Sequence, residues 1–194
     1  MLDLDSLRAR LDGRLLGLTG APGAGKSTLA ARLASAWDAV VVPMDGFHLA
    51  DVELARRGLL DRKGAPETFD AEGYAALLAR VRGREALVMA PSFERDLEQP
   101  IAGALPVRGS APLVVTEGNY LLLDEPRWAA VRAQLDAVWH LRVDPALRRE
   151  RLVARHVAFG KSPAEAEAWV RAVDDPNAAL VEAAAARADL VIDL

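Results

Sequence analysis

The chain has 194 residues, 52% of them hydrophobic, which fits one ordinary α/β domain with a sizeable core. Acidic residues (28) outnumber basic residues (24), and neither end carries a basic arm, so nonspecific nucleic-acid binding is not expected. The chain has no cysteine, which excludes disulfides, thiolate zinc sites and cysteine nucleophiles.

The first residues, MLDLDSLRARLDGR, are charged and helix-periodic, unlike a signal peptide. No apolar run approaches the ~18 residues that a membrane-spanning helix needs. We therefore expect a cytoplasmic protein with no membrane or nucleic-acid partner. Whether it forms a homodimer stays open.

Short apolar runs alternate with longer helical patterns along the chain. The predicted strands are 15–19, 40–43, 86–89, 113–116, 137–143 and 190–192. Several of these runs are continuously apolar, which is typical of parallel strands buried on both faces. Helices are predicted to start after Asp70, after Asp144 and at a capping box of Ser162 and Glu165. This alternation predicts an α/β fold, with an open, mostly parallel sheet and helices on both faces.

The interval 91–112, PSFERDLEQPIAGALPVRGSAP, is rich in proline and glycine. This composition indicates a small flap or hairpin instead of a core element. The sequence shows no interdomain linker, so residues 1–194 are expected to form a single domain.

Residues 20–27, GAPGAGKS, match the G-x-x-x-x-G-K-S pattern of a phosphate loop between a strand and a helix. Glycines let successive N–H groups turn toward phosphate oxygens, and the helix adds the positive end of its dipole. Lys26 is expected to reach the β- and γ-phosphates, and the Ser27 hydroxyl to bind Mg²⁺. The predicted nucleotide-binding residues of the loop are Gly20, Ala21, Pro22, Gly23, Ala24, Gly25, Lys26, Ser27 and Thr28. We therefore expect ATP or GTP binding.

Two carboxylates follow predicted strands, Asp45 after VVVPM and Glu117 at the end of PLVVTE. Ligands of open α/β sheets bind beyond the carboxyl ends of strands, so both carboxylates are expected beside the phosphate loop. Asp45 is the predicted general base for an acceptor hydroxyl, with a possible water-mediated contact to Mg²⁺. Glu117 is predicted to hold the metal ion or its water. Taken alone, Asp45 is also consistent with a turn residue and Glu117 with a surface residue.

The acceptor is expected to bind near Asp45. Phe47 and His48 follow it directly, and the alternatives for them are a core aromatic residue and a structural histidine. The loop 59–70 and the predicted flap supply further polar and aromatic side chains. The predicted acceptor-binding residues are Phe47, His48, Lys63, Phe93, Arg95 and Tyr120.

The helix predicted from Pro145 carries Arg148, Arg151 and Arg155 at a spacing that puts them on one face. Such a helix can close over ATP, as part of a lid at about 145–175, and place a guanidinium against the transferring phosphate. Arg151 and Arg155 are the predicted catalytic arginines, beside Lys26 and Asp45. The alternative is a solvated basic face.

Together the phosphate loop, PMDGFH, KGAPETFD, TEGNYLLLD and the arginine helix resemble the phosphoribulokinase, uridine kinase and pantothenate kinase superfamily over nearly the whole chain. The likeness is greatest to the short bacterial branch described as fructose-transport-system or nucleoside kinases. It implies a three-layer P-loop kinase fold with a five-stranded core sheet, ATP as donor, Mg²⁺, and a hydroxyl-bearing small molecule (a sugar, a nucleoside or a pantothenate-like compound). It matches Asp45 to the family's Asp-x-Phe acid, Glu117 to its Glu-Gly pair, and Arg151 with Arg155 to its lid.

The resemblance places a loop beside the adenine base at 174–180, which makes Asn177 a predicted nucleotide contact. His48 stands where uridine kinases usually have tyrosine, which argues against uridine as the acceptor. The alternative function is a nucleotide-binding ATPase or switch module that acts through a protein partner. A catalytically idle relative is a further alternative, which the presence of Lys26, Ser27, Asp45 and Glu117 disfavours. The sequence leaves open whether GTP can replace ATP as the phosphoryl donor.

Overall fold

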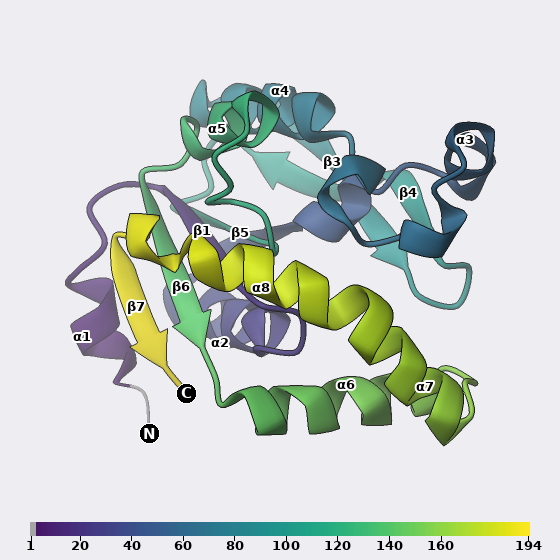
Figure 1. Ribbon diagram of the computed structural model, residues 1–194. Coiled ribbons are helices and arrows are strands. Elements are labelled where there is room, and N and C mark those ends of the chain that lie inside the picture. The colour runs from purple at the N-terminus through teal and green to yellow at the C-terminus, as the bar shows by residue number, and fades with distance from the viewer. Residues whose placement is uncertain (1–2) are drawn as a thin grey trace.

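Five parallel strands form the core sheet in the computed structural model, which describes residues 3–194 (Figure 1). The strand order is β2-β5-β1-β6-β7, and every neighbouring pair is parallel. The strands are β1 (Leu15–Gly20), β2 (Ala39–Pro43), β5 (Leu113–Glu117), β6 (Ala137–Arg142) and β7 (Leu190–Asp193). The predicted α/β fold with a five-stranded parallel core is therefore confirmed.

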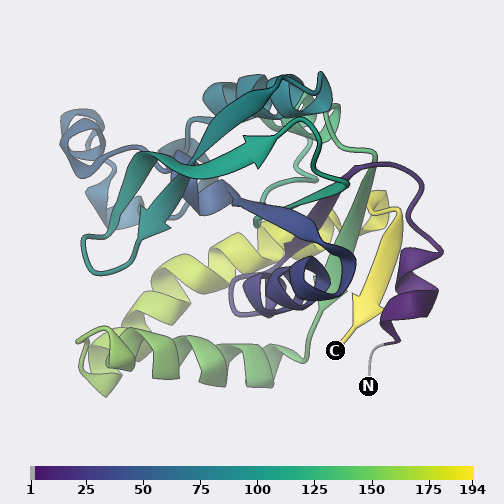
Figure 2. The same ribbon diagram turned by 180° about the vertical axis from the view of Figure 1, so that it is seen from behind.

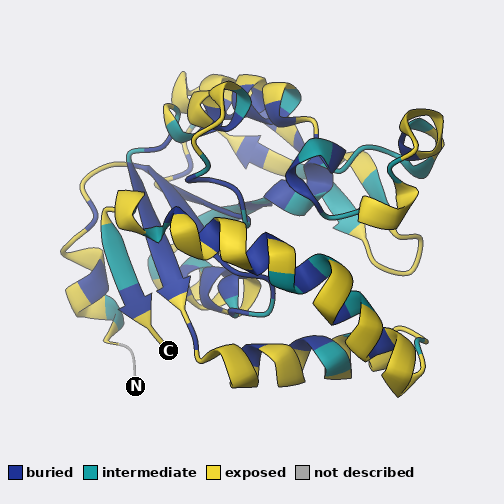
Figure 3. Cartoon of the chain, in the orientation of Figure 1, coloured by how far each residue is buried: buried dark blue, intermediate teal, exposed yellow. Residues whose placement is uncertain are grey.

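Helices cover both faces of this sheet, as the two opposite views show (Figures 1 and 2). On one face lie α4 (Ala71–Arg82), α5 (Pro126–Arg132) and α8 (Asp175–Ala183), and on the other α1 (Leu4–Arg8) and α2 (Lys26–Trp37). Alternate residues of a strand serve opposite layers. In β5, Val114 packs in the first layer, whereas Leu113 and Val115 pack in the second. All residues of β1 and β5 are buried (Figure 3), which explains their continuously apolar sequence.

The predicted helix starts are confirmed by their caps. The Asp70 carboxylate accepts a hydrogen bond from the Gly73 N–H at the start of α4. Asp144 caps α6 (Pro145–Ala158), and Ser162 with Glu165 forms a reciprocal capping box at the start of α7 (Pro163–Trp169). Such local polar contacts satisfy N–H groups that have no partner within the helix.

The strand predicted at 86–89 lies outside the core sheet. It is the start of β3 (Leu87–Glu94), which pairs antiparallel with β4 (Gln99–Arg108) in a separate two-stranded hairpin. The hairpin therefore begins before the predicted flap boundary at residue 91. Leu87 and Met89 are exposed while Val88 and Ala90 are buried, so β3 buries only one face, unlike a strand between two helix layers.

Short elements connect β2 to α4 beneath the hairpin. They are the 3₁₀ helix η1 (Met44–Phe47), α3 (Asp51–Arg57) and the 3₁₀ turns η2 (Leu60–Arg62) and η3 (Pro66–Thr68). A π-helical segment, η4 (Val170–Asp174), joins α7 to α8, and a last 3₁₀ turn, η5 (Ala185–Arg187), precedes β7. The loop predicted at 174–180 is thus wrong, because this segment is helical. Over residues 3–194, no helix is long and apolar enough to span a membrane.

Candidate active site

A cavity of about 650 Å³ lies beyond the carboxyl ends of β1, β2 and β5. Its wall combines the phosphate loop (residues 20–28), the segment after β2, the β3–β4 hairpin and the helices from α6 to α8. Most of the predicted site residues meet here: Pro22, Gly23, Gly25, Lys26, Ser27, Thr28, Asp45, His48, Lys63, Phe93, Arg95, Glu117, Arg151, Arg155 and Asn177. Folding therefore brings five separate stretches of sequence to one cavity, because Glu117 at the end of β5 joins the four wall segments.

The phosphate loop has the backbone shape that an anion requires. Gly25 has φ +90°, in the left-handed region that favours glycine, and α2 starts directly after it at Lys26. The Lys26 ammonium is buried and donates to the carbonyl oxygens of Gly20 (2.9 Å) and Ala21 (3.1 Å). Burial lowers the pKa of Lys26, while the nearby carboxylates of Glu117 and Asp45 oppose that change. A glycine turn, a helix N-terminus and a buried cation together fit the phosphates of a nucleotide.

Ser27 and Glu117 form a polar pair beside the loop, with the Ser27 hydroxyl donating to Glu117 Oε1 at 3.0 Å. Burial raises the pKa of Glu117, and the negative charge of Asp45 raises it further. No group of three or more His, Cys, Asp and Glu residues within 3–194 could hold a metal ion. Mg²⁺ commonly takes one or two protein ligands and completes its shell with phosphate oxygens and water. The Ser27 and Glu117 pair fits an ion of that kind.

Asp45 lies in η1, immediately beyond β2, and its carboxylate faces the hairpin. Arg95, which follows β3, places Nη2 2.9 Å from Asp45 Oδ2. Gly46 explains why the hairpin comes so close, because a Cβ atom added there would lie 2.6 Å from the Pro91 carbonyl oxygen. A glycine after Asp45 therefore lets β3 pass directly over the segment that carries the carboxylate.

Aromatic rings surround His48 at the cavity wall. Its ring centroid lies 4.0 Å from that of Phe69 and 4.8 Å from that of Phe93. His48 Nδ1 lies 2.8 Å from the Asp45 carbonyl oxygen, so Nδ1 is the donor of this hydrogen bond. Burial lowers the pKa of His48, which favours the neutral ring. The neutral tautomer then leaves Nε2 as a hydrogen-bond acceptor.

Arg151 and Arg155 of α6 both line the cavity, but Arg148 does not. Arg148 lies at the spacing expected for the same helix face, but its side chain is buried with Nη2 2.5 Å from Asp175 Oδ1 and does not reach the cavity. Asp175 begins α8 and draws Arg148 toward that helix. The remaining two arginines, one helical turn apart, line the same cavity as the phosphate loop.

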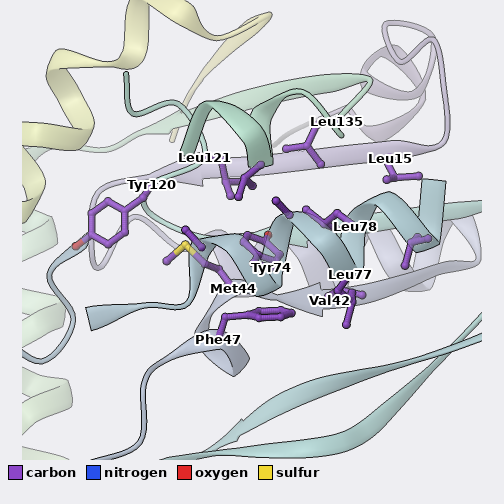
Figure 4. Packing of buried hydrophobic residues seen from close by; sticks show 14 of the residues in the cluster. Leu15, Val42, Met44, Phe47, Tyr74, Leu77, Leu78, Tyr120, Leu121 and Leu135 are labelled. Atoms are coloured by element: carbon purple, nitrogen blue, oxygen red, sulfur yellow. The ribbon is translucent and has the colours of Figure 1, made fainter. Parts of the chain in front are cut away.

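Phe47 and Tyr120 do not line the cavity, in contrast to their predicted acceptor contacts. Both belong to the hydrophobic cluster that also contains Tyr74, Leu77 and Leu78 of α4 (Figure 4). The Phe47 ring packs on Tyr74 at a centroid distance of 4.6 Å, and the Tyr120 hydroxyl donates to the Gly64 carbonyl oxygen. Gly20, Ala21 and Ala24, which were predicted to contact the nucleotide, are also buried and do not line the cavity.

Some cavity residues were not predicted from the sequence: Phe69, Asn119, His156, Trp169 and Asp174. His156 Nε2 lies 2.8 Å from Asp174 Oδ2, so this pair joins α6 to η4. Asn177, the predicted nucleotide contact, points its amide toward the Gly64 carbonyl oxygen (3.5 Å). The position of His156 directly after Arg155 is the sequence signal that could have identified it.

Comparison with known proteins supports the assignment that this geometry suggests. No family model matches the chain. A protein of Schizosaccharomyces pombe named putative uridine kinase is 36% identical over 171 residues, covering 81% of this chain and 72% of that protein. A pantothenate kinase of Limosilactobacillus reuteri is 33% identical over 144 residues, covering 67% of this chain and 44% of that protein.

A solved structure from Silicibacter sp. TM1040, described as a putative fructose transport system kinase, superposes with a TM-score of 0.89 and 42% identity. The match covers 97% of this chain and 96% of that one, so the fold and most of the cavity wall lie within the shared region. These relatives support ATP-dependent transfer of a phosphoryl group to a small molecule. The chain therefore belongs to the superfamily of P-loop kinases that includes the uridine and pantothenate kinases, and it is a small-molecule kinase.

Proposed function

We propose that the protein transfers the γ-phosphoryl group of ATP to a hydroxyl of a small metabolite that binds between Asp45 and the β3–β4 hairpin. One observation carries this proposal: Asp45 lies in the same cavity as the phosphate loop and as Arg151 and Arg155 of α6. The carboxylate is then near the transferred phosphate but outside the phosphate loop itself. That is the position a general base for an acceptor hydroxyl requires.

Each residue has a defined part in this transfer. The phosphate loop and Lys26 hold the β- and γ-phosphates. Ser27 and Glu117 would hold Mg²⁺, and a bound ion would supply positive charge next to the phosphate oxygens. Asp45 accepts the hydroxyl proton as the acceptor oxygen bonds to the γ-phosphorus. The bond from that phosphorus to the bridging oxygen breaks, and ADP leaves with the electron pair. Arg151 and Arg155 stabilise the negative charge that develops during the transfer.

The acceptor side of the cavity supports a small polar compound with several hydroxyls. His48 and Phe93 offer ring surfaces, His48 Nε2 offers an acceptor, and Lys63 and Arg95 bring donors to the same wall. Sugars, nucleosides and pantothenate-like compounds all carry a suitable hydroxyl. The names of the relatives point to the same classes.

A screen of these acceptor classes with ATP and Mg²⁺ tests the proposal. Wild type should phosphorylate at least one acceptor, and Asp45→Asn should lower kcat by about 10²–10⁴-fold because it removes the base. ATP binding should survive in Asp45→Asn, since the phosphate loop is unchanged. Arg108→Ala, on the exposed side of β4, is the matched surface control.

The alternative, an ATPase or switch module that acts through a protein partner, gives a different result. It would show no turnover of any acceptor and hydrolysis of ATP that depends on the partner. Acceptor phosphorylation that survives unchanged in Asp45→Asn would contradict the role proposed for this carboxylate.

A further inference from the structure

The three key polar groups of the cavity all contact other groups of the same chain. Lys26 donates to carbonyl oxygens of its own loop, and Ser27 donates to Glu117. Phosphates and Mg²⁺ can replace those two contacts when the nucleotide binds. The third contact joins Asp45 and Arg95, and neither residue belongs to the phosphate loop. Nucleotide binding alone therefore leaves a guanidinium on the proposed base.

Contacts at the hairpin tip keep Arg95 in this place. The Lys63 ammonium donates to Asp51 Oδ1 at 2.7 Å and to the Glu98 carbonyl oxygen at 2.5 Å. The Asp51 N–H donates to Gln99 Oε1 at 3.2 Å. The turn that carries Arg95 is thus attached on its β4 side to α3 and to the loop before η3.

Phe93 secures the other side of the same turn. Its ring packs against His48 in a tilted arrangement with an interplanar angle of 48°, and the Arg95 guanidinium lies 5.3 Å from the Phe93 centroid. A cation at this distance is attracted to the ring face. The guanidinium therefore has two partners, the Phe93 ring and the Asp45 carboxylate, and both lie at the cavity.

The guanidinium lies on Asp45 Oδ2 and takes the place beside that oxygen which a hydroxyl or a water would need in order to donate to it. We propose that Arg95 is a positioning residue that masks Asp45 until an acceptor binds, so that bound ATP is not transferred to water. This inference rests on the proposed role of Asp45 as base. In the reaction that it prevents, Asp45 takes a proton from water and the water oxygen bonds to the γ-phosphorus. The bridging P–O bond then breaks, giving ADP and inorganic phosphate.

The ion pair is a poor candidate for a purely structural role. The Arg95 side chain is 45% exposed and that of Asp45 is 30% exposed. Exposed ion pairs contribute little to folding stability. Arg95→Ala is therefore expected to fold, and its effect should appear in turnover.

The test measures ATP hydrolysis with Mg²⁺ and no acceptor. Arg95→Ala should raise the rate by about tenfold or more over wild type, because the freed carboxylate can orient and deprotonate water. Arg95→Lys keeps a positive charge and should raise the rate less. The double variant Arg95→Ala, Asp45→Asn should lose the increase. Arg108→Ala, on the same hairpin, should hydrolyse ATP as slowly as wild type.

Hydrolysis that stays at the wild-type rate or falls in Arg95→Ala would overturn the masking role, and so would an increase that persists in the double variant. The two proposals fail separately. If no acceptor is phosphorylated but the increase appears and depends on Asp45, masking stands and the proposed acceptor transfer fails. If acceptors are phosphorylated through Asp45 but Arg95→Ala leaves hydrolysis unchanged, only masking fails.

Discussion

At the scale of single residues, burial shifts the pKa of several ionisable groups, and the sequence alone does not reveal which groups are buried. Lys26, Glu117 and His48 all carry pKa shifts caused mainly by desolvation. The sequence correctly suggested that Lys26 and Glu117 lie beside one cavity, because both follow strands of a parallel sheet. It could not show that Phe47 turns inward, because the alternation of core and surface at η1 depends on Tyr74, which lies on another element.

His140 provides a pH-dependent prediction at this scale. Its side chain is buried in β6, and Nε2 lies 3.2 Å from Glu182 Oε2. Burial lowers the pKa of His140, and the positive charges of Arg142 and Lys26 add to this, although Glu182 opposes it. The folded protein therefore binds this proton more weakly than the unfolded chain, whose histidine pKa is about 6.5.

Above about pH 6.5 this histidine should therefore leave the free energy of unfolding unchanged. As the pH falls from there toward the lower pKa of the folded state, the free energy of unfolding should decrease by at most about 1.4 kcal/mol per pH unit. His140→Gln should weaken that decrease. Urea denaturation of both proteins between pH 5 and pH 8 measures it. The pKa of the half-buried His48 is also lowered by desolvation, so part of the pH dependence should remain. An identical pH profile in the two proteins would contradict the prediction.

At the scale of elements, the features that the sequence predicted well were local ones. The capping aspartates, the capping box and the phosphate loop each involve residues within one turn of each other. The start of the hairpin was predicted less well. Residues 86–89 form a short apolar run, and such a run occurs both in core strands and in hairpin strands. The distinction depends on the partner strand, and β4 is separated from β3 by a turn with no strong hairpin signal.

The capping box of α7 allows a test of an element. Ser162→Ala removes the hydroxyl that accepts from the Glu165 N–H, which should cost about 1 kcal/mol of helix stability. Hydrogen exchange of the α7 amides should speed up by roughly fivefold, which is that energy converted to a rate. Ser35→Ala, on the exposed face of α2, is the control and should leave exchange in α7 unchanged. Unchanged exchange in Ser162→Ala would show that packing, not the cap, holds α7.

At the scale of the whole molecule, the cavity unites segments from nearly the full length of the chain, from Pro22 to Asn177. The phosphate loop and α6 touch through Gly23, where an added Cβ would lie 3.0 Å from Leu152 Cγ. A ligand that binds this cavity therefore stabilises elements on both sides of the sheet. Such coupling makes ligand binding measurable as global stability.

ATP with Mg²⁺ should raise the unfolding free energy of wild type by about 2.7 kcal/mol at a concentration one hundred times its Kd. Lys26→Ala should lose most of this increase, because it removes the buried cation of the phosphate loop. Arg10→Ala, exposed and away from the cavity wall, should retain it. Thermal unfolding with and without the nucleotide measures the difference. An equal increase in Lys26→Ala would contradict the assigned binding site.

The sequence by itself determined the fold class, the phosphate loop and the two strand-end carboxylates, because each is encoded by residues close together in the chain. Strand periodicity, helix caps and glycine turns depend on short-range sterics and hydrogen bonds, which act before any tertiary contact forms. Only the tertiary structure decided that Arg148 turns to Asp175, that Tyr120 enters the core and that Arg95 lies on Asp45. The partners of these side chains come from distant segments, so their competition for packing space and opposite charge is settled only when the segments meet.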